Sequence, residues 1–165
     1  MRAHAAARGV ELQVRRFRAT TRTAEDAARQ VGTEVGRIVK SLVFAAGSDP
    51  VVALCPGDVR VDERRLAAAL GAREIRRATA EEAKDFTGYA IGGVPPFAHT
   101  RPCRLVADDG LLRFDLVWAA AGLPDAVFPI APQELVRLSG AVVAPIAQRS
   151  SSSSADSSSP SYSSE

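Results

Sequence analysis

Residues 38–54 read IVKSLVFAAGSDPVVAL, and this stretch decides the fold class. Two apolar runs flank Gly47-Ser48-Asp49-Pro50, a cluster of residue types that favour turns. The pattern predicts a β-hairpin with strands over 38–46 and 51–54. Because helix signals and short β-like runs alternate on both sides of this hairpin, the sequence predicts an α+β domain and not a helix bundle or a β-sandwich.

Helix start and stop signals punctuate the rest of the chain. Thr23 and Thr79 are each followed three residues later by an acidic residue, as in a capping box, and Asp62 is a third N-cap. Glycines stand where these helices should end. The sequence predicts helices before residue 9 and over 24–31, 62–70, 79–86 and 132–138, the last with proline in its first turn.

Short strands are predicted over 12–17, 104–107, 111–114, 116–121, 126–130 and 141–146. The triplet Asp108-Asp109-Gly110 separates two of them. Asp and Gly supply the positive φ of a tight turn, so this triplet predicts a second hairpin.

The length of 165 residues and the 46% apolar composition predict one domain with a sizeable core. Composition changes near residue 148, because eleven of the fourteen serines fall between 150 and 164. A segment of this kind cannot bury apolar area. We therefore expect a folded body over 1–147 and a Ser-rich disordered tail over 148–165.

No apolar run approaches the roughly 18 residues that a membrane span needs, and the start lacks the apolar stretch of a secretory signal. We expect a cytoplasmic protein with no membrane partner. Cys55 and Cys103 are isolated from each other, which argues against a disulfide framework and a zinc site, so no metal or other cofactor is expected. The net charge of +2 does not by itself indicate a nucleic-acid partner.

Lysine is rare here: the chain has nineteen arginines and only Lys40 and Lys84. Lys40 stands inside the first apolar strand, where a compact ammonium group could serve a site. Alternatively, its stem covers apolar surface while its head reaches water. Lys84 stands among acidic residues and is expected to be a solvated partner on a helix face.

Residues 87–102 are rich in glycine and proline and form no regular element. Gly92 and Gly93 let the backbone approach a ligand and expose N–H groups that can bind an oxyanion, while Pro95 and Pro96 stiffen the loop. The alternative is an ordinary surface connection. The loop lacks the spacing of the glycine-rich phosphate-binding motifs.

Two other features carry weaker hypotheses. His99 and Cys103 could form a thiol–imidazole pair for a cysteine hydrolase, but Pro102 disfavours the helix that would align them. Basic side chains gather near the start of the chain, where Glu11 is the single acidic residue. These basic side chains either follow a phosphate backbone or form a solvated face. They are Arg2, Arg8, Arg15, Arg16, Arg18 and Arg22.

The stretch 38–44 and the loop 87–96, with TAEDAA at 23–28 upstream, resemble the YbaK/EbsC-type aminoacyl-tRNA editing domains associated with prolyl-tRNA synthetase. The likeness extends to 119–122 and 132–147. It implies a compact, curved, mixed β-sheet, barrel-like, with helices packed around it. It further implies a free-standing deacylase that hydrolyses the ester of a mischarged small amino acid, of the Cys or Ala type, on proline tRNA.

The resemblance assigns the family's lysine to Lys40 and its Gly-x-x-x-Pro loop to Gly92 and Pro96. In this interpretation Gly92 and Gly93 contact the ester or the ribose hydroxyls, and Lys40 contacts the carbonyl or a terminal phosphate. Lining a small pocket are Val94, Pro95, Pro96 and Phe97. Partners would be the acceptor end of aminoacyl-tRNA and a synthetase, and the alternative is a non-catalytic module of the same fold that binds tRNA or a synthetase.

This sequence departs from the family at two places. Some members carry tyrosine where Phe17 stands, and an acidic residue of their C-terminal third has only Asp125 nearby, out of register. These departures bear on which amino acid is cleared more than on the class of reaction.

Overall fold

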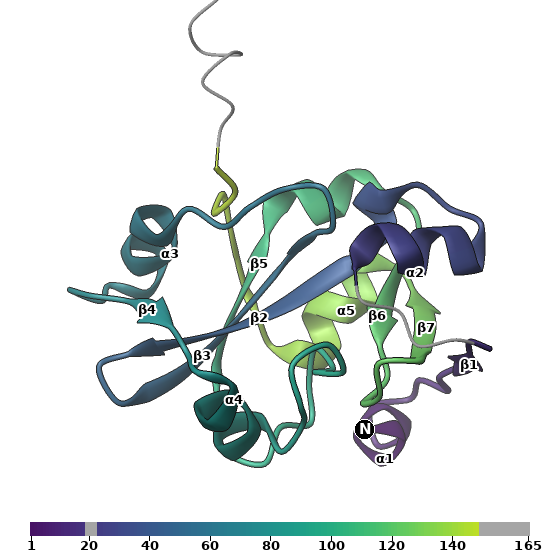
Figure 1. Cartoon of the computed structure of the whole chain (residues 1–165), viewed down its shortest axis with the longest axis horizontal. Coiled ribbons are helices and arrows are strands. Elements are labelled where there is room, and N and C mark those ends of the chain that lie inside the picture. Colours follow the sequence, from purple (N-terminus) through teal and green to yellow (C-terminus); the bar gives the residue numbers. More distant parts are fainter. Residues whose placement is uncertain (19–22, 149–165) are drawn as a thin grey trace, which may run out of the picture.

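A computed structural model describes residues 1–18 and 23–148 of the chain. The hairpin of strands β2 (Val39–Ala46) and β3 (Asp49–Pro56) runs through the middle of the molecule (Figure 1). Helix α3 (Glu63–Leu70) and strand β4 (Arg76–Arg77) lie toward one end of this hairpin, and α2 (Ala24–Val31) lies toward the other. The hairpin therefore connects two differently built parts of the protein.

The predicted first hairpin is confirmed. Strand β2 (Val39–Ala46) pairs antiparallel with β3 (Asp49–Pro56), in a register that runs from Val39 opposite Pro56 to Ala46 opposite Asp49. The turn is tighter than expected, because Asp49 and Pro50 already belong to β3. Gly47 opens the two-residue connection with a φ of +64°, a conformation that glycine adopts without strain.

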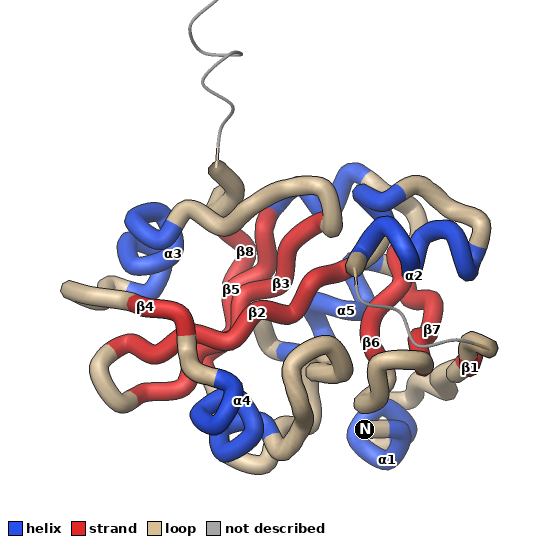
Figure 2. Tube along the Cα trace, viewed as in Figure 1, coloured by secondary structure: helices blue, strands red, loops and turns tan. Residues whose placement is uncertain are grey.

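The strands form two sheets, which Figure 2 shows in red. The larger has the order β4-β2-β3-β5-β8, where β5 (Arg104–Asp108) lies parallel to both β3 and β8 (Val142–Ala144). The smaller is antiparallel with the order β1-β7-β6. Its strands are β1 (Arg15–Arg16), β6 (Val117–Ala120) and β7 (Ala126–Ile130).

This arrangement confirms the mixed α+β class, but the barrel-like closure is not confirmed. Among residues 1–18 and 23–148 the backbone pairing between the two sheets is limited to a single isolated bridge from Ile38 to Trp118. A closed barrel needs every strand paired on both sides, whereas β4 and β8 are short edge strands of two and three residues. The two sheets therefore remain separate.

The second predicted hairpin is wrong. Residues Asp109–Arg113 form a 3-10 helix, η2, and β5 pairs with parallel neighbours instead. The buried carboxylate of Asp108 accepts hydrogen bonds from the backbone N–H groups of Gly110 (3.0 Å), Ile146 (2.9 Å) and Ala147 (3.1 Å). Asp108 thus ties the end of β5 to the end of the described chain, a role that a local turn signal does not reveal.

The helices follow their capping signals closely. Thr23 accepts a hydrogen bond from the N–H of Asp26, Asp62 accepts from those of Arg64 and Arg65, and Thr79 makes a full capping box with Glu82. The remaining helices are α1 (Arg2–Ala6), η1 (Val35–Arg37), α4 (Ala80–Thr87) and α5 (Pro132–Ser139). The helix predictions are therefore confirmed to within a residue or two at each end.

The expected boundary between body and tail stays a prediction. Gln148 is held in place, since its N–H donates to the carbonyl of Arg60 at 2.7 Å. The rest of the expected Ser-rich tail, 149–165, lies outside the described residues, as does Arg22 of the basic cluster. Within the described ranges, no helix has the length and apolar character needed to cross a membrane.

Candidate active site

A cavity of about 280 Å³ lies beside β2, where the outer edge of this strand is uncovered. Strand β4 pairs only with Phe44 and Ala45, and Val43 accepts one further hydrogen bond from Ala78. Toward the other end of β2, the bridge from Ile38 leads to β6. The cavity lies along the stretch between these contacts. It is lined by Thr23, Ala24, Ala27, Ile38, Val39, Lys40, Ser41, Leu42, Ile91, Gly92, Val94, Trp118, Ala120, Leu123, Pro124, Ala126 and Val127.

Lys40 lines this cavity from β2 and is half-buried. Its ammonium group donates a hydrogen bond to the backbone carbonyl of Val59 at 2.5 Å. None of the ion pairs within residues 1–18 and 23–148 involves Lys40. Since an ammonium group has three donors, the hydrogen bond to Val59 leaves two N–H groups of Lys40 without a protein partner among the described residues.

Gly92 lines the same cavity from the glycine-rich loop. The loop is ordered: Gly88 ends α4 in the left-handed conformation, and Thr87 and Thr100 hydrogen-bond across the loop's base. Gly92 is exposed with a φ of +97°, and no hydrogen bond of the described residues uses its N–H. The N–H of Gly93, by contrast, donates to the carbonyl of Ala90 at 3.0 Å. Gly92 is therefore the loop amide that can meet a ligand.

The structure brings three of the seven predicted site residues to the cavity: Lys40, Gly92 and Val94. The other four, Gly93, Pro95, Pro96 and Phe97, are buried and do not line it. Phe97 belongs to the central core, where its ring stacks on His4 with centroids 5.0 Å apart. These four support the loop from behind.

Ser41 is a cavity residue that the sequence analysis missed. Its hydroxyl oxygen is buried and is the only such side-chain atom in the described part of the chain without a hydrogen-bond partner. Side chains two residues apart in a strand lie on the same face of the sheet, so Ser41 lies on the same face of β2 as Val39 and Val43. Sequence offers no signal for an unpaired hydroxyl, because pairing depends on which segments approach it.

The predicted thiol–imidazole pair does not form. The imidazole of His99 hydrogen-bonds the carbonyl of Pro95 at 2.7 Å, while the thiol of Cys103 lies 3.3 Å from the carbonyl of Arg101. Burial raises the pKa of the Cys103 thiol to about 11, which disfavours the thiolate that a nucleophile needs. A cysteine hydrolase is therefore not supported.

Basic residues flank the cavity on the side of the small sheet. The guanidinium of Arg15 lies 4.9 Å from the ring centroid of Trp118, which lines the cavity. The neighbouring Arg16 pairs with Asp125 at 2.8 Å, and this hydrogen bond holds the pKa of the Asp125 carboxyl below its usual range. Asp125 itself does not line the cavity, although Pro124 and Ala126 do.

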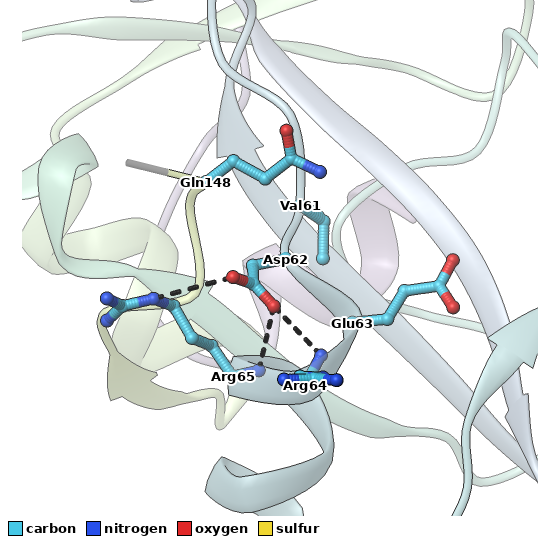
Figure 3. A pocket seen from close by; sticks show the side chains of 6 residues that line it. All are labelled: Val61, Asp62, Glu63, Arg64, Arg65 and Gln148. Atoms are coloured by element: carbon cyan, nitrogen blue, oxygen red, sulfur yellow. Dashed lines mark hydrogen bonds and ion pairs between the residues drawn. The ribbon is translucent and has the colours of Figure 1, made fainter. Parts of the chain in front are cut away.

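A larger hollow of about 490 Å³ lies at the start of α3, but its chemistry is already explained (Figure 3). The carboxylate of Asp62 caps the helix by accepting from the N–H groups of Arg64 and Arg65, and it also pairs with the Arg65 side chain. The Asp62 carboxylate at the centre of this hollow is therefore already used to cap the helix. In the described part of the chain, no three His, Cys, Asp or Glu side chains are grouped so as to hold a metal ion.

Residues 18–138 match the model of a protein family described as the aminoacyl-tRNA editing domain. The chain belongs to this family. The matched range includes β2, the glycine-rich loop and the whole cavity lining. The resemblance inferred from the motifs is thereby confirmed, and with it the reaction class of an aminoacyl-tRNA deacylase.

Individual relatives support the assignment of this editing domain. It is 32% identical to the uncharacterized protein YwhH of Bacillus subtilis, over 78% of this chain and 82% of that protein. It is 28% identical to EbsC of Enterococcus faecalis, provisionally named a Cys-tRNA(Pro)/Cys-tRNA(Cys) deacylase, over 75% and 76% of the two chains. The proline–tRNA ligase of Elusimicrobium minutum is 40% identical over 45% of this chain but only 13% of the ligase.

Among solved structures, one provisionally described as a trans-editing enzyme for prolyl tRNA synthetase superposes with a TM-score of 0.84. It is 42% identical in sequence, and the match covers 90% of this chain and 94% of that one. The agreement therefore includes the fold as well as the local motifs.

Proposed function

We propose that this protein acts in trans to hydrolyse the ester of a mischarged small amino acid, of the Cys or Ala type, on proline tRNA. The observation that carries the proposal is that Lys40 and Gly92, about fifty positions apart, line one small cavity. The names of EbsC and of the trans-editing structure support the choice of amino acid and tRNA.

The reaction needs little chemical machinery because an aminoacyl ester is already activated. Water attacks the carbonyl carbon, the bond from that carbon to the ribose oxygen breaks, and the proton of the water ends on the ribose. Negative charge develops on the carbonyl oxygen, where the Lys40 ammonium and the Gly92 N–H are suited to stabilise it. With a cysteinyl ester, the substrate's own thiol could attack the carbonyl carbon, so that the ribose oxygen leaves with the thiol proton and water then opens the cyclic thioester to free cysteine.

Size and polarity of the cavity favour a small amino acid. Its volume of about 280 Å³ lies just below the range of about 300–1,000 Å³ typical of small-molecule sites. Most of its lining is apolar, so a charged side chain would lose its hydration there.

The partners of this reaction are the acceptor end of aminoacyl-tRNA and, by extension, the synthetase that mischarges it. Such a protein would work in the cytoplasm, where translation takes place. The mechanism draws only on protein side chains, main-chain amides and water.

The test is a deacylation panel. Alanyl, cysteinyl, seryl and prolyl esters of proline tRNA, with cysteinyl-tRNA(Cys), would be incubated with wild type, Lys40→Ala and the surface control Lys84→Ala. We expect hydrolysis of a small-residue ester, sparing of the prolyl ester, and a loss of about 10²- to 10³-fold in kcat/KM for Lys40→Ala alone.

Failure of the wild type on every small-residue ester would refute the proposal. Salt-dependent tRNA binding without turnover would instead assign the protein as a non-catalytic binding module. Equal activity of Lys40→Ala and Lys84→Ala would keep the reaction but remove Lys40 from it.

A further inference from the structure

Two large apolar side chains stand exposed at the cavity. Ile91 is 56% exposed and Leu123 is 47% exposed, and both line the cavity although they come from different loops. The other large hydrophobic side chains exposed among the described residues do not line it: Leu112, Leu116, Val142 and Val143. Ile91 and Leu123 therefore form what we call the apolar rim.

The backbone fixes the rim in place. A side-chain carbon added at Gly93 would lie 3.1 Å from backbone atoms of Gly122 and Leu123, so the absence of a side chain lets the two loops touch. Gly122 has a φ of +101°, and a side-chain carbon added there would lie 3.0 Å from the ring of Tyr89. The N–H of Ala126 closes its turn onto the carbonyl of Leu123 at 3.2 Å. The apolar rim is thus a built feature of two mutually braced loops.

The substrate itself determines what lies at this rim. The ester that the cavity would hold is joined to the terminal ribose of tRNA, and that ribose also carries an adenine. Because the aminoacyl group enters the cavity while the rest of the tRNA stays outside it, the substrate leaves the cavity through its ribose. The adenine must therefore lie at the mouth, and its flat faces pack well against apolar side chains.

Charge around the mouth also fits a nucleic acid better than a protein. Arg15 is exposed, lies over the cavity residue Trp118, and has no carboxylate partner among the described residues. An unpaired guanidinium beside the mouth is suited to the phosphates that precede the terminal nucleoside.

We propose that Ile91 and Leu123 clamp the terminal adenine of the substrate tRNA and thereby position its ester in the cavity. This inference rests on the proposed deacylase function. It makes the rim a positioning element, which contacts the nucleoside and leaves the reacting atoms to Lys40 and Gly92.

The experiment compares Ile91→Ala, Leu123→Ala and the double variant with Val142→Ala, whose parent side chain is 55% exposed on β8. Each would be assayed on an aminoacylated acceptor-stem helix and on the methyl ester of the same amino acid, which lacks the nucleoside. On the helix we expect KM to rise about 5- to 10-fold for each single variant, with kcat within about twofold and Val142→Ala unchanged. On the methyl ester the rim variants should equal wild type.

An unchanged KM of the double variant on the helix would overturn the clamp. An equal rise of KM on the methyl ester would also overturn it, because the rim would then contact the amino acid and not the adenine. If the wild type is a dimer and the double variant is a monomer, the apolar rim is instead a contact between two copies of the chain. If the wild type hydrolyses nothing, the proposed function fails. In that case calorimetry would measure the affinity of an amide-linked aminoacyl-adenosine for the wild type and for the double variant. The clamp requires that the wild type bind this compound more than about fivefold tighter.

Discussion

The two halves of strand β2 differ in how they are covered. Over 43–45 the strand is buried, with β3 on one edge and β4 with its following residue on the other. Over 39–42 it keeps β3 on one edge but faces the cavity on the other, and three of these four residues are only partly buried. One continuous strand therefore serves as core in one half and as a wall of the site in the other.

This difference teaches that the site arises where sheet pairing stops. A partner strand along 39–42 would satisfy the outer edge and close the cavity. Because the packed half fixes the position of the open half, the half with few contacts can carry polar groups at little cost to folding. Stability and activity should then respond to different residues of the same strand.

The largest expected effect comes from the packed half. Phe44 is 1% exposed and packs in the cluster between β2 and α3, with Arg77 stacked on its ring. Phe44→Ala should lower the free energy of unfolding by about 3–5 kcal/mol, while kcat/KM per folded molecule stays within about twofold at low temperature. Urea unfolding and deacylation assays measure the two quantities. If kcat/KM per folded molecule falls as well, the two halves of β2 do not differ in this way.

A smaller effect is expected from Cys55 of β3, which lies opposite Lys40 in the open half of β2. Burial raises the pKa of its thiol to about 11. Between its ordinary value near 9 and this value, the unfolded chain loses the proton while the folded protein keeps it, so stability falls as pH rises. The fall from pH 9 to 11 should be about 2–3 kcal/mol smaller in Cys55→Ala than in wild type.

Urea titrations at successive pH values measure this difference. Cys103→Ala is the companion variant, because burial also raises the pKa of that thiol to about 11, and it should reduce the fall by a smaller amount since its side chain is only partly buried. Identical pH slopes in wild type and Cys55→Ala would mean that the thiol is not shielded from water.

The smallest effect is expected from Ser41 in the open half. Its buried hydroxyl has no partner in the described chain, so Ser41→Ala should raise the free energy of unfolding by about 1 kcal/mol. Because the hydroxyl oxygen is closed off from the cavity, the same change should leave KM within about twofold. Thermal unfolding with steady-state kinetics separates the two. Lower stability with unchanged kinetics would make the hydroxyl structural.

Local signals predicted much of the fold because they act within one helical turn. Thr23, Asp62 and Thr79 mark their helices by accepting hydrogen bonds from N–H groups two or three residues away, so the sequence contains both partners. Asp108 failed as a signal for the opposite reason, since two of its three N–H partners lie at Ile146 and Ala147. The parallel pairing of β5 with β3 and β8 depends on the same distant contacts.

The site divides in the same manner. Lys40 was predicted from its rarity and its place in an apolar strand, and Gly92 from the composition of its loop. Ser41 and the apolar rim were not predicted, because an unpaired hydroxyl and two exposed side chains are defined by what fails to cover them. Pro95, Pro96 and Phe97 were assigned to the pocket by resemblance, yet they lie buried behind it.

The sequence by itself determined the family, the helix limits, the first hairpin and the two residues around which the chemistry is proposed. Those properties depend on side-chain types and on partners close along the chain. Only the tertiary structure decided that the two sheets stay open, which edge of β2 is left free, and that this edge faces the glycine-rich loop. These depend on contacts between segments far apart in the chain, whose choice is made by packing the whole domain at once.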